Sequence, residues 1–374
     1  MRTRFLALAL GVFLHALPGR AADMREPLPQ VFSEAEFATM LASVDRALAW
    51  IASQQDADGS FRAAQKSECQ PALTALPVMA FLSRGHRPGV GPYGALLDRA
   101  IDFTLLSQKW NGVFAWRSAD GQPRTGLAAG WDPRQQDTYS HAIALLMLGE
   151  VYGMTGGERS GRVRIAIEKG LRFTHESWNV GKKAPKDDGG WRYFTYPFES
   201  DLSVTGWHAL SLRSVKNAGF DVPKEVTDRV ATYVRRCYQP EARRFIYIPG
   251  EGGGSPSLAM TGAGVLCLSL FGEHQHPFVI AGGATLAQVN FSGGNDLGDR
   301  PFYTCYYLTQ AAAQLGGEPW RKIYRKTSDY LLPLQQLDGS WAPIDDRQFG
   351  PIYSTTLVVL ALTPQLQLLP IYQH

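Results

Sequence analysis

Residues 330–343 read YLLPLQQLDGSWAP, and residues 50–63 read WIASQQDADGSFRA. In both stretches an aromatic residue is followed five positions later by Gln, then four positions later by Gly, and then two positions later by another aromatic residue. A third copy, FTLLSQKWNGVFAW, occupies residues 103–116. Because self-similar units are the signature of repeat architectures, we predict a chain built from repeats.

Each copy ends a helix-like stretch, and a more apolar run follows after a loop rich in Gly and Pro. Gly closes most of these second runs, as is typical just past a helix end. The second helices are expected at 71–85, 139–153, 202–219, 258–272, 302–317 and 352–364, and the first helices at 34–54, 95–107, 162–177, 224–238, 277–289 and 319–334. The second helices align on a column made of Thr74, His141, Thr205, Thr261, Thr304 and Thr355.

Six such pairs predict a closed ring. A helix pair cannot bury its apolar faces alone, so a stack of pairs must be capped or closed. Neither end of the chain has a polar capping unit, and the first and last units carry the two best copies of the pattern. We therefore predict an all-α fold, a single (α/α)6 toroid over residues 31–374 whose two ends meet. The second helices should form the inner wall, and the column should edge a central space.

The first 22 residues read as a secretory signal peptide, with a basic MRTR, an apolar stretch of about 13 residues and small residues before the cleavage point. No stretch reaches the ~20 apolar residues of a membrane span. We therefore expect an exported, periplasmic or extracellular protein without a transmembrane span. Scattered basic residues and a net charge of +3 do not indicate a nucleic-acid partner.

Export makes disulfide bonds possible, and sequence alone cannot choose the pairing among the four cysteines. The sequence also contains no signal that indicates the oligomeric state. The cysteines are Cys69, Cys237, Cys267 and Cys305.

The repeated pattern resembles the QW motif of triterpene cyclases. Arg46-Ala47, Trp50, Gln55, Gly59 and Phe61 fit that motif, and so do the matching positions in 99–114 and 326–341, with weaker versions in units three and four. The chain is thus similar to the superfamily of squalene cyclases and protein prenyltransferase β-subunits over nearly its whole length after the signal peptide. The resemblance implies an α/α toroid in which the Gln bonds at a helix end and the aromatic residue packs against a neighbouring repeat.

The catalytic motifs of that superfamily are not retained. DLSVTG at 201–206 stands where squalene–hopene-type cyclases carry D-x-D-D-T-A, so Asp201 matches the first Asp while Ser203 replaces the proton donor. FYTCYYLTQ at 302–310 is similar to the H-T-C-Y-C-L-S segment of the prenyltransferases, but Tyr303 replaces the zinc-binding His. The sequence contains no Asp-x-Cys, so we expect neither a zinc site nor another cofactor.

Two carboxylates stand four residues before the column in adjacent units, Asp137 and Asp201. They are either N-caps of their helices or paired carboxylates facing one pocket, in which case His141 joins them as a candidate acid or base. An aromatic-rich stretch, DDGGWRYFTYPFESD at 187–201, leads to Asp201 and either stacks on a ligand or roofs the core. The candidate ligand-binding residues are Trp191, Tyr193, Tyr196, Phe198, Trp207, Tyr139, Tyr303 and Asp299.

These features favour a protein that binds an apolar, isoprenoid-like small molecule or a peptide in a central cavity, without the known catalysis. Two alternatives stay open. One is an enzyme, either a carbohydrate-active lyase or hydrolase or a divergent cyclase, that uses Asp137, Asp201 and His141. The other is an interaction scaffold in the cell envelope. The sequence does not decide whether the protein is an enzyme.

Overall fold

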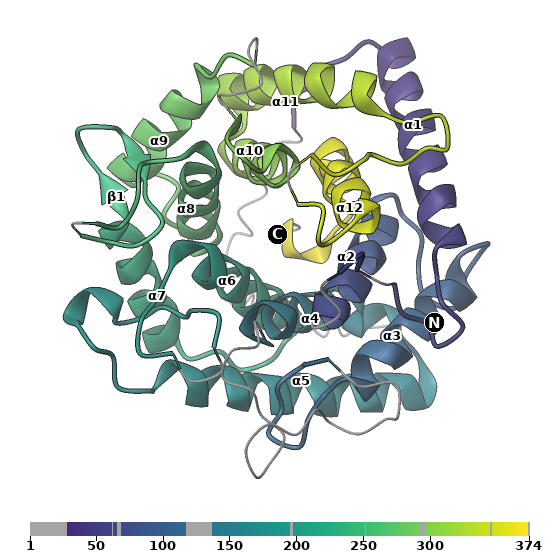
Figure 1. The fold of residues 1–374 in the computed structure, drawn as a ribbon, viewed down its shortest axis with the longest axis horizontal. Coiled ribbons are helices and arrows are strands. Elements are labelled where there is room, and N and C mark those ends of the chain that lie inside the picture. Colours follow the sequence, from purple (N-terminus) through teal and green to yellow (C-terminus); the bar gives the residue numbers. More distant parts are fainter. Residues whose placement is uncertain are drawn as a thin grey trace, which may run out of the picture.

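The computed structural model describes residues 28–61, 63–65, 69–116, 137–194, 197–250, 252–291, 297–344 and 346–372. These residues form twelve α-helices arranged as two concentric rings (Figure 1). Two short strands, β1 (Tyr238–Gln239) and β2 (Arg244–Phe245), pair antiparallel in one connection. The predicted all-α (α/α)6 toroid is therefore confirmed.

The inner ring is closed, because each inner helix contacts the next one and the last contacts the first. Inner helices are buried along nearly their whole length, whereas outer helices bury one face, as predicted from their composition. The inner ring comprises α2 (Gln70–Ser83), α4 (Asp137–Val151), α6 (Leu202–Asn217), α8 (Leu258–Leu270), α10 (Pro301–Leu315) and α12 (Pro351–Leu362). The outer ring comprises α1 (Glu34–Ser53), α3 (Gly94–Leu106), α5 (Gly157–Trp178), α7 (Lys224–Arg236), α9 (Pro277–Ala287) and α11 (Gly317–Leu331).

The Gln of each repeated stretch ties its own connection to the outer helix of the next unit. Gln335 Nε2 donates to Gly339 O within its connection and to Ser43 O of α1, each at 2.9 Å. Gln335 Oε1 accepts from Ser43 Oγ at 2.7 Å and from Arg46 Nη2 at 2.6 Å. The last unit is thereby bonded to the first. Equivalent bonds run from Gln55 to Leu96 O of α3 and from Gln108 to Ala166 O of α5.

The Gly of the pattern permits this close approach. Gly339 has φ +96°, a conformation that side chains with a Cβ rarely adopt, and a Cβ atom there would lie 2.7 Å from Arg46 O. We call each such contact between a glycine turn and the next outer helix a joint. Three further joints press Gly59 against Arg99 O, Gly112 against Lys169 O and Gly189 against Arg229 O, where a Cβ atom would lie 2.3–2.4 Å away.

The aromatic residue after each joint glycine is buried, and its backbone N–H is bonded to the column. Trp341 N donates to Thr355 Oγ1 at 2.9 Å, and Phe114 N donates to His141 Nδ1 at 3.4 Å. The column therefore holds connections against inner helices, and the prediction that it edges the central space is wrong. The same bond joins Phe61 to Thr74, Trp191 to Thr205 and Phe245 to Thr261, whereas Thr304 donates to Leu297 O.

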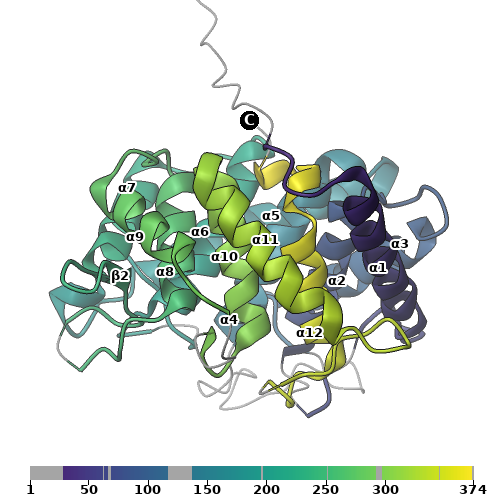
Figure 2. The same cartoon turned by 90° about the horizontal axis from the view of Figure 1, so that it is seen from above.

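The two mouths of the ring differ. The inner helices all begin at one end, which we call the N-terminal mouth, and end at the other, the C-terminal mouth (Figure 2). The short helical turns η6 (Pro364–Leu366) and η7 (Pro370–Tyr372) cross the C-terminal mouth, and the end of the chain lies over the centre of the ring (Figure 1). Ile371 N donates to Glu150 Oε2 of α4 at 3.1 Å. Burial raises the pKa of Glu150 to about 7, although the bonds from Ser214 and Ile371 oppose this shift.

None of the four cysteines, all of which lie in the described residues, forms a disulfide bond, and all are buried. Burial raises the pKa of the Cys267 thiol to about 12. In the described part of the chain, no helix has both the length and the apolar character needed to cross a bilayer.

We predict that Gly339→Ala destabilises the ring more than Gly219→Ala does. Gly219 has a similar φ of +91° but no atom within 4 Å of an added Cβ, so it reports backbone strain alone. We expect the free energy of unfolding to fall by about 3 kcal/mol for Gly339→Ala and by about 1 kcal/mol for Gly219→Ala, measured by urea unfolding. Equal losses would contradict a steric role for the closing joint.

Candidate functional site

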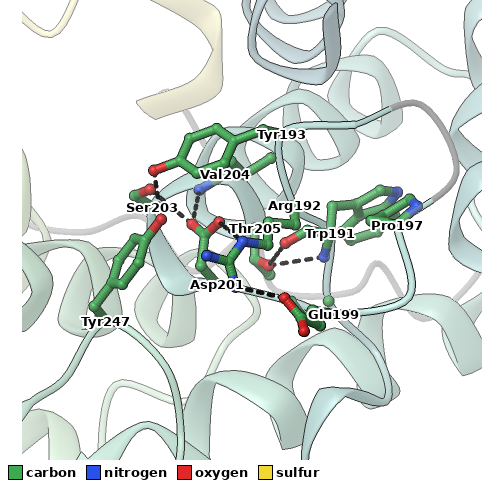
Figure 3. A network of polar contacts seen from close by, with 12 residues as sticks. Trp191, Arg192, Tyr193, Pro197, Glu199, Asp201, Ser203, Val204, Thr205 and Tyr247 are labelled. Atoms are coloured by element: carbon green, nitrogen blue, oxygen red, sulfur yellow. Dashed lines mark hydrogen bonds and ion pairs between the residues drawn. The ribbon is translucent and has the colours of Figure 1, made fainter. Parts of the chain in front are cut away.

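Asp201 caps the first turn of α6 at the N-terminal mouth (Figure 3). Its backbone is extended, and its Oδ1 atom accepts from Val204 N at 2.9 Å and from Ser203 Oγ at 2.7 Å. The N-cap interpretation of Asp201 is thereby confirmed. Asp137 is the first residue of α4 and is also buried, with 1% of its surface exposed.

The carboxyl group of Asp201 is completely buried and holds its proton more tightly than usual. Burial raises its pKa to about 6, while the bonds from Val204 and Ser203 and the charge of Arg192 lower it. Arg192 Nε lies 4.0 Å from Asp201 Oδ2, and Arg192 Nη1 pairs with Glu199 at 3.0 Å. Asp201 therefore releases its proton near pH 6 and is mostly a carboxylate at neutral pH.

A chain of hydroxyl groups leads from Asp201 toward the mouth. Tyr139 OH donates to Ser203 Oγ at 2.6 Å, and Ser203 Oγ in turn donates to Asp201. The Tyr139 ring is only half-buried and stacks on the Tyr193 ring, with centroids 5.7 Å apart. Hydroxyl groups both donate and accept, so this chain can carry a proton between the buried carboxyl and the mouth.

Further phenol rings gather around this chain. Tyr193 OH is hydrogen-bonded to Tyr247 OH, and Tyr303 packs edge-to-face on Tyr307 at 4.9 Å. Burial raises the pKa of Tyr303, and the nearby charge of Asp201 adds to that shift, so this phenol stays neutral. We call Tyr139, Tyr193, Tyr247 and Tyr303 the tyrosine cluster; its members come from α4, from the two connections before α6 and α8, and from α10.

The start of α4 is hydrogen-bonded to the connection that leads into α6. Thr138 Oγ1, next to Asp137, donates to Arg192 O at 2.6 Å. The structure thus brings α4, which begins at Asp137, against the segment whose Arg192 side chain faces Asp201.

His141 lies in the joint of unit two. Its ring is completely buried, stacks on Phe114 and accepts or donates through Nε2 to Thr174 Oγ1 at 2.8 Å. Burial lowers its pKa to about 3, so it stays neutral. Because its nitrogen atoms face joint groups, we infer that His141 supports the joint and does not act as an acid or base.

Two predicted ligand-binding tryptophans belong to the core. Trp191 is the buried joint residue of unit three, with its indole Nε1 donating to Ser177 Oγ at 3.1 Å. Trp207 is 1% exposed and stacks on Tyr306 at 5.4 Å inside the ring. Both side chains are enclosed by protein, so the roof interpretation holds for Trp191.

The other predicted ligand-binding residues lie at different depths. Tyr139, Tyr193 and Tyr303 meet in the tyrosine cluster. Phe198 is 57% exposed, and Asp299 is exposed in the turn before α10. Tyr196 lies outside the described residues.

Sequence reasoning missed Tyr247 and the role of Ser203. Tyr247 comes two positions after Phe245, the aromatic residue bonded to the column in unit four, just as Tyr193 comes two positions after Trp191. Aligning the units on these buried aromatic residues would have placed both tyrosines at the same mouth. Among the described residues, no three His, Cys, Asp or Glu side chains gather as metal ligands would.

No protein-family model matches the chain, and no curated protein matches it. Solved structures match over most of its length. The type II terpene cyclase MstE from Scytonema, in a variant bound to its product merosterolic acid A, has a TM-score of 0.57 at 14% identity, covering 90% of this chain and 100% of that chain. The GH76A α-1,6-mannanase from Salegentibacter sp. HEL1_6 has a TM-score of 0.60 at 12% identity, covering 88% and 99%.

A protein from Actinoplanes is similar to the same extent, with a TM-score of 0.57 at 16% identity and coverage of 87% and 99%. The chain has the α/α toroid fold. At these identities the likeness shows the fold alone, and the predicted superfamily resemblance is confirmed at that level.

We predict that Asp201→Asn removes a pH-dependent loss of stability. The folded-state pKa of about 6 exceeds the ordinary 3.8, so the unfolded chain gives up this proton first as the pH rises. The free energy of unfolding of the wild type should therefore fall relative to Asp201→Asn between about pH 4 and pH 6, by about 2 kcal/mol, and stay lower above pH 6. Asn preserves the N-cap.

Urea unfolding at pH values from 4 to 8 measures this difference. Asp228→Asn, at an exposed carboxylate paired with Lys224, is the control and should follow the wild type. If the curves for Asp201→Asn and the wild type ran parallel, the raised pKa would be refuted.

Proposed function

We propose that the protein binds an apolar, isoprenoid-like small molecule at the tyrosine cluster of the N-terminal mouth. The observation that carries this proposal is the convergence of four phenol rings from four segments around a carboxyl group that is completely buried. Neutral rings offer flat apolar faces, while the charge of Asp201 is sealed beneath Ser203 and Tyr139. A ligand at this mouth would meet rings and hydroxyls rather than a carboxylate.

The known catalysis of the resembling cyclases does not follow from this arrangement. Ser203 stands where the resemblance places the proton donor, and its hydroxyl donates to Asp201. A serine hydroxyl is far too weak an acid to protonate an alkene, so we propose binding without that step. MstE, which shares the fold, was solved with geranylgeranyl dihydroxybenzoate as its substrate, and an isoprenoid chain therefore fits a toroid of this kind.

We place this binding outside the cytoplasm, because residues 1–22 read as a signal peptide. If the bound molecule proved to be a peptide, the proposed class of ligand would be wrong, but the proposed site would stand.

We predict that Tyr303→Ala weakens binding of geranylgeraniol about tenfold and that Tyr303→Phe leaves it within about twofold. The ring supplies apolar area, whereas its hydroxyl is not needed by an apolar chain. Titration followed by intrinsic fluorescence measures both affinities, and mass spectrometry of an organic extract of the purified protein identifies the bound molecule. Tyr152→Ala, in the short helical turn η2 (Tyr152–Met154) after the C-terminal end of α4, is the control. Equal affinity of the wild type and Tyr303→Ala would contradict the site.

A second candidate is a carbohydrate-active enzyme. The specific observation in its favour is the carboxyl of Asp201, whose pKa burial raises to about 6 and which is joined by hydroxyl groups to Tyr139. The mannanase from Salegentibacter shares the fold, and its name states that it acts on α-1,6-mannan. In this function Asp137 and Asp201 would divide the acid and base roles.

We predict for this candidate that α-1,6-mannan is hydrolysed by the wild type and that Asp137→Asn and Asp201→Asn each lower the rate at least about a hundredfold. Reducing-sugar release measures the rate, with Asp228→Asn on the outer helix α7 as the control. Wild-type protein without measurable hydrolysis, or full activity in Asp201→Asn, would exclude this reaction.

A further inference from the structure

The segment that crosses the C-terminal mouth, residues 364–372, is tied to the ring through its backbone (Figure 1). Ile371 N donates to the buried carboxyl of Glu150 on α4, and Asn217 Nδ2 at the end of α6 donates to Pro370 O at 3.3 Å. The two short turns of the segment, η6 and η7, pack against α10 and α6 respectively. We call residues 364–372 the strap.

The carboxyl of Glu150 has no positively charged partner among the described residues. The titratable groups that face it are the phenols of Tyr306 on α10 and Tyr372 of the strap, and burial raises the pKa of both, so they stay neutral. No charged side chain of the described residues, including Arg213 and Lys216 on α6, shifts the pKa of Glu150. A carboxylate at this position would therefore be a buried charge without a counter-charge.

The helices beside Glu150 leave no room for water between them. At the end of α4, a Cβ atom added at Gly149 would lie 2.4 Å from Ser214 Oγ of α6, so the two helices are in close contact. Glu150 Oε1 lies 2.6 Å from the same hydroxyl, and Glu150 is 1% exposed. The strap covers the carboxyl from the mouth, so movement of the strap is the way to hydrate it.

We propose that the strap is a pH-dependent gate of the C-terminal mouth, which stays docked while Glu150 is protonated and is released when Glu150 becomes a carboxylate. The docked geometry suits the acid. The O–H of protonated Glu150 donates to Ser214 Oγ, Ser214 donates to Leu146 O at 3.2 Å, and the other carboxyl oxygen accepts from Ile371 N. Every proton in this chain then has an acceptor, and no charge is buried.

The strap can leave without unfolding of the ring. Of its aliphatic side chains only Leu369 and Ile371 are buried, and local segments with few buried contacts open at a lower free energy than the whole fold. Gln367, between η6 and η7, has φ +50°, a conformation that is unfavourable for a residue with a Cβ atom and that release would relieve. Release would uncover Tyr306, whose ring stacks on Trp207 inside the ring of helices.

The direction of the pH effect follows from the two states of Glu150. Burial raises its pKa to about 7 in the docked state, above the ordinary 4.5 that a hydrated carboxyl would regain after release. Docking is therefore strongest at low pH and weakens as the pH rises. The docking constant should fall by more than about tenfold between pH 5 and pH 7 and level off above about pH 8.

Amide hydrogen exchange of the strap, measured by mass spectrometry from pH 5 to pH 8, tests this proposal. Glu150→Gln keeps an uncharged group that can accept from Ile371 N and donate to Ser214 Oγ, and it cannot titrate. The ratio of the wild-type exchange rate to the Glu150→Gln rate should rise by more than about tenfold between pH 5 and pH 7. Comparison at the same pH removes the intrinsic pH dependence of exchange.

Two control variants should follow the wild type. Glu168→Gln removes an exposed carboxylate that pairs with Arg164 on the outer helix α5. His374→Gln removes the imidazole of the last residue, which lies outside the described residues and ordinarily titrates near pH 6.5. The amides of α8 are the internal reference, and their exchange ratio should not change with pH.

A constant ratio across this pH range would overturn the proposal, and so would an equal rise in the amides of α8, because the whole ring would then loosen. If Glu150→Gln did not fold, the wild-type rate would be divided by that of a synthetic peptide of residues 364–372, and the same rise is expected. The proposal goes beyond the ligand at the tyrosine cluster. The assay contains no ligand, so its outcome leaves that proposal to be judged separately.

Discussion

The contact between a glycine turn and the outer helix of the next unit is the constraint on which the whole ring depends. A backbone at positive φ brings the turn so close to the neighbouring carbonyl that no side chain fits between them. The Gln of the same turn then bonds a backbone carbonyl of that helix. Because Gln335 and Gly339 make this contact with α1, closure of the ring is one more copy of a bond that the chain already uses elsewhere.

The joints also determine what lies at the N-terminal mouth. Each buried aromatic residue of a joint fixes the start of the following segment by its bond to the column, and two positions later the side chain can reach the mouth. Tyr193 and Tyr247 arrive there in this way, from successive units, and their hydroxyls meet. Equivalent positions of successive repeats thus bring different side chains to the same mouth. The column residues themselves are buried, because they bond the connections.

Two buried carboxyl groups mark the two ends of the ring. At the C-terminal mouth Glu150 accepts the backbone N–H of Ile371 and holds the end of the chain across the opening. At the N-terminal mouth Asp201 accepts from Ser203 Oγ and Val204 N and lies 4.0 Å from Arg192 Nε, and the half-buried Tyr139 lies beyond Ser203. The end of the chain therefore crosses the C-terminal mouth, and the described residues at the N-terminal mouth present phenol rings and their hydroxyl groups.

The sequence by itself determined the twelve helices, their order in two rings, and closure of the ends, because periodic apolar runs and a repeated Gln–Gly–aromatic pattern are local signals that each unit states again. It also offered a helix cap as one of two roles for Asp201, because a cap depends only on neighbours in the chain, and the structure shows that cap. Tertiary structure alone decided which aromatic side chains are exposed: Trp191 and Trp207 read like Tyr193 in the sequence, yet they are buried. How deeply a side chain is buried in a closed ring depends on which segments of distant units pack against it. No local sequence pattern encodes that packing.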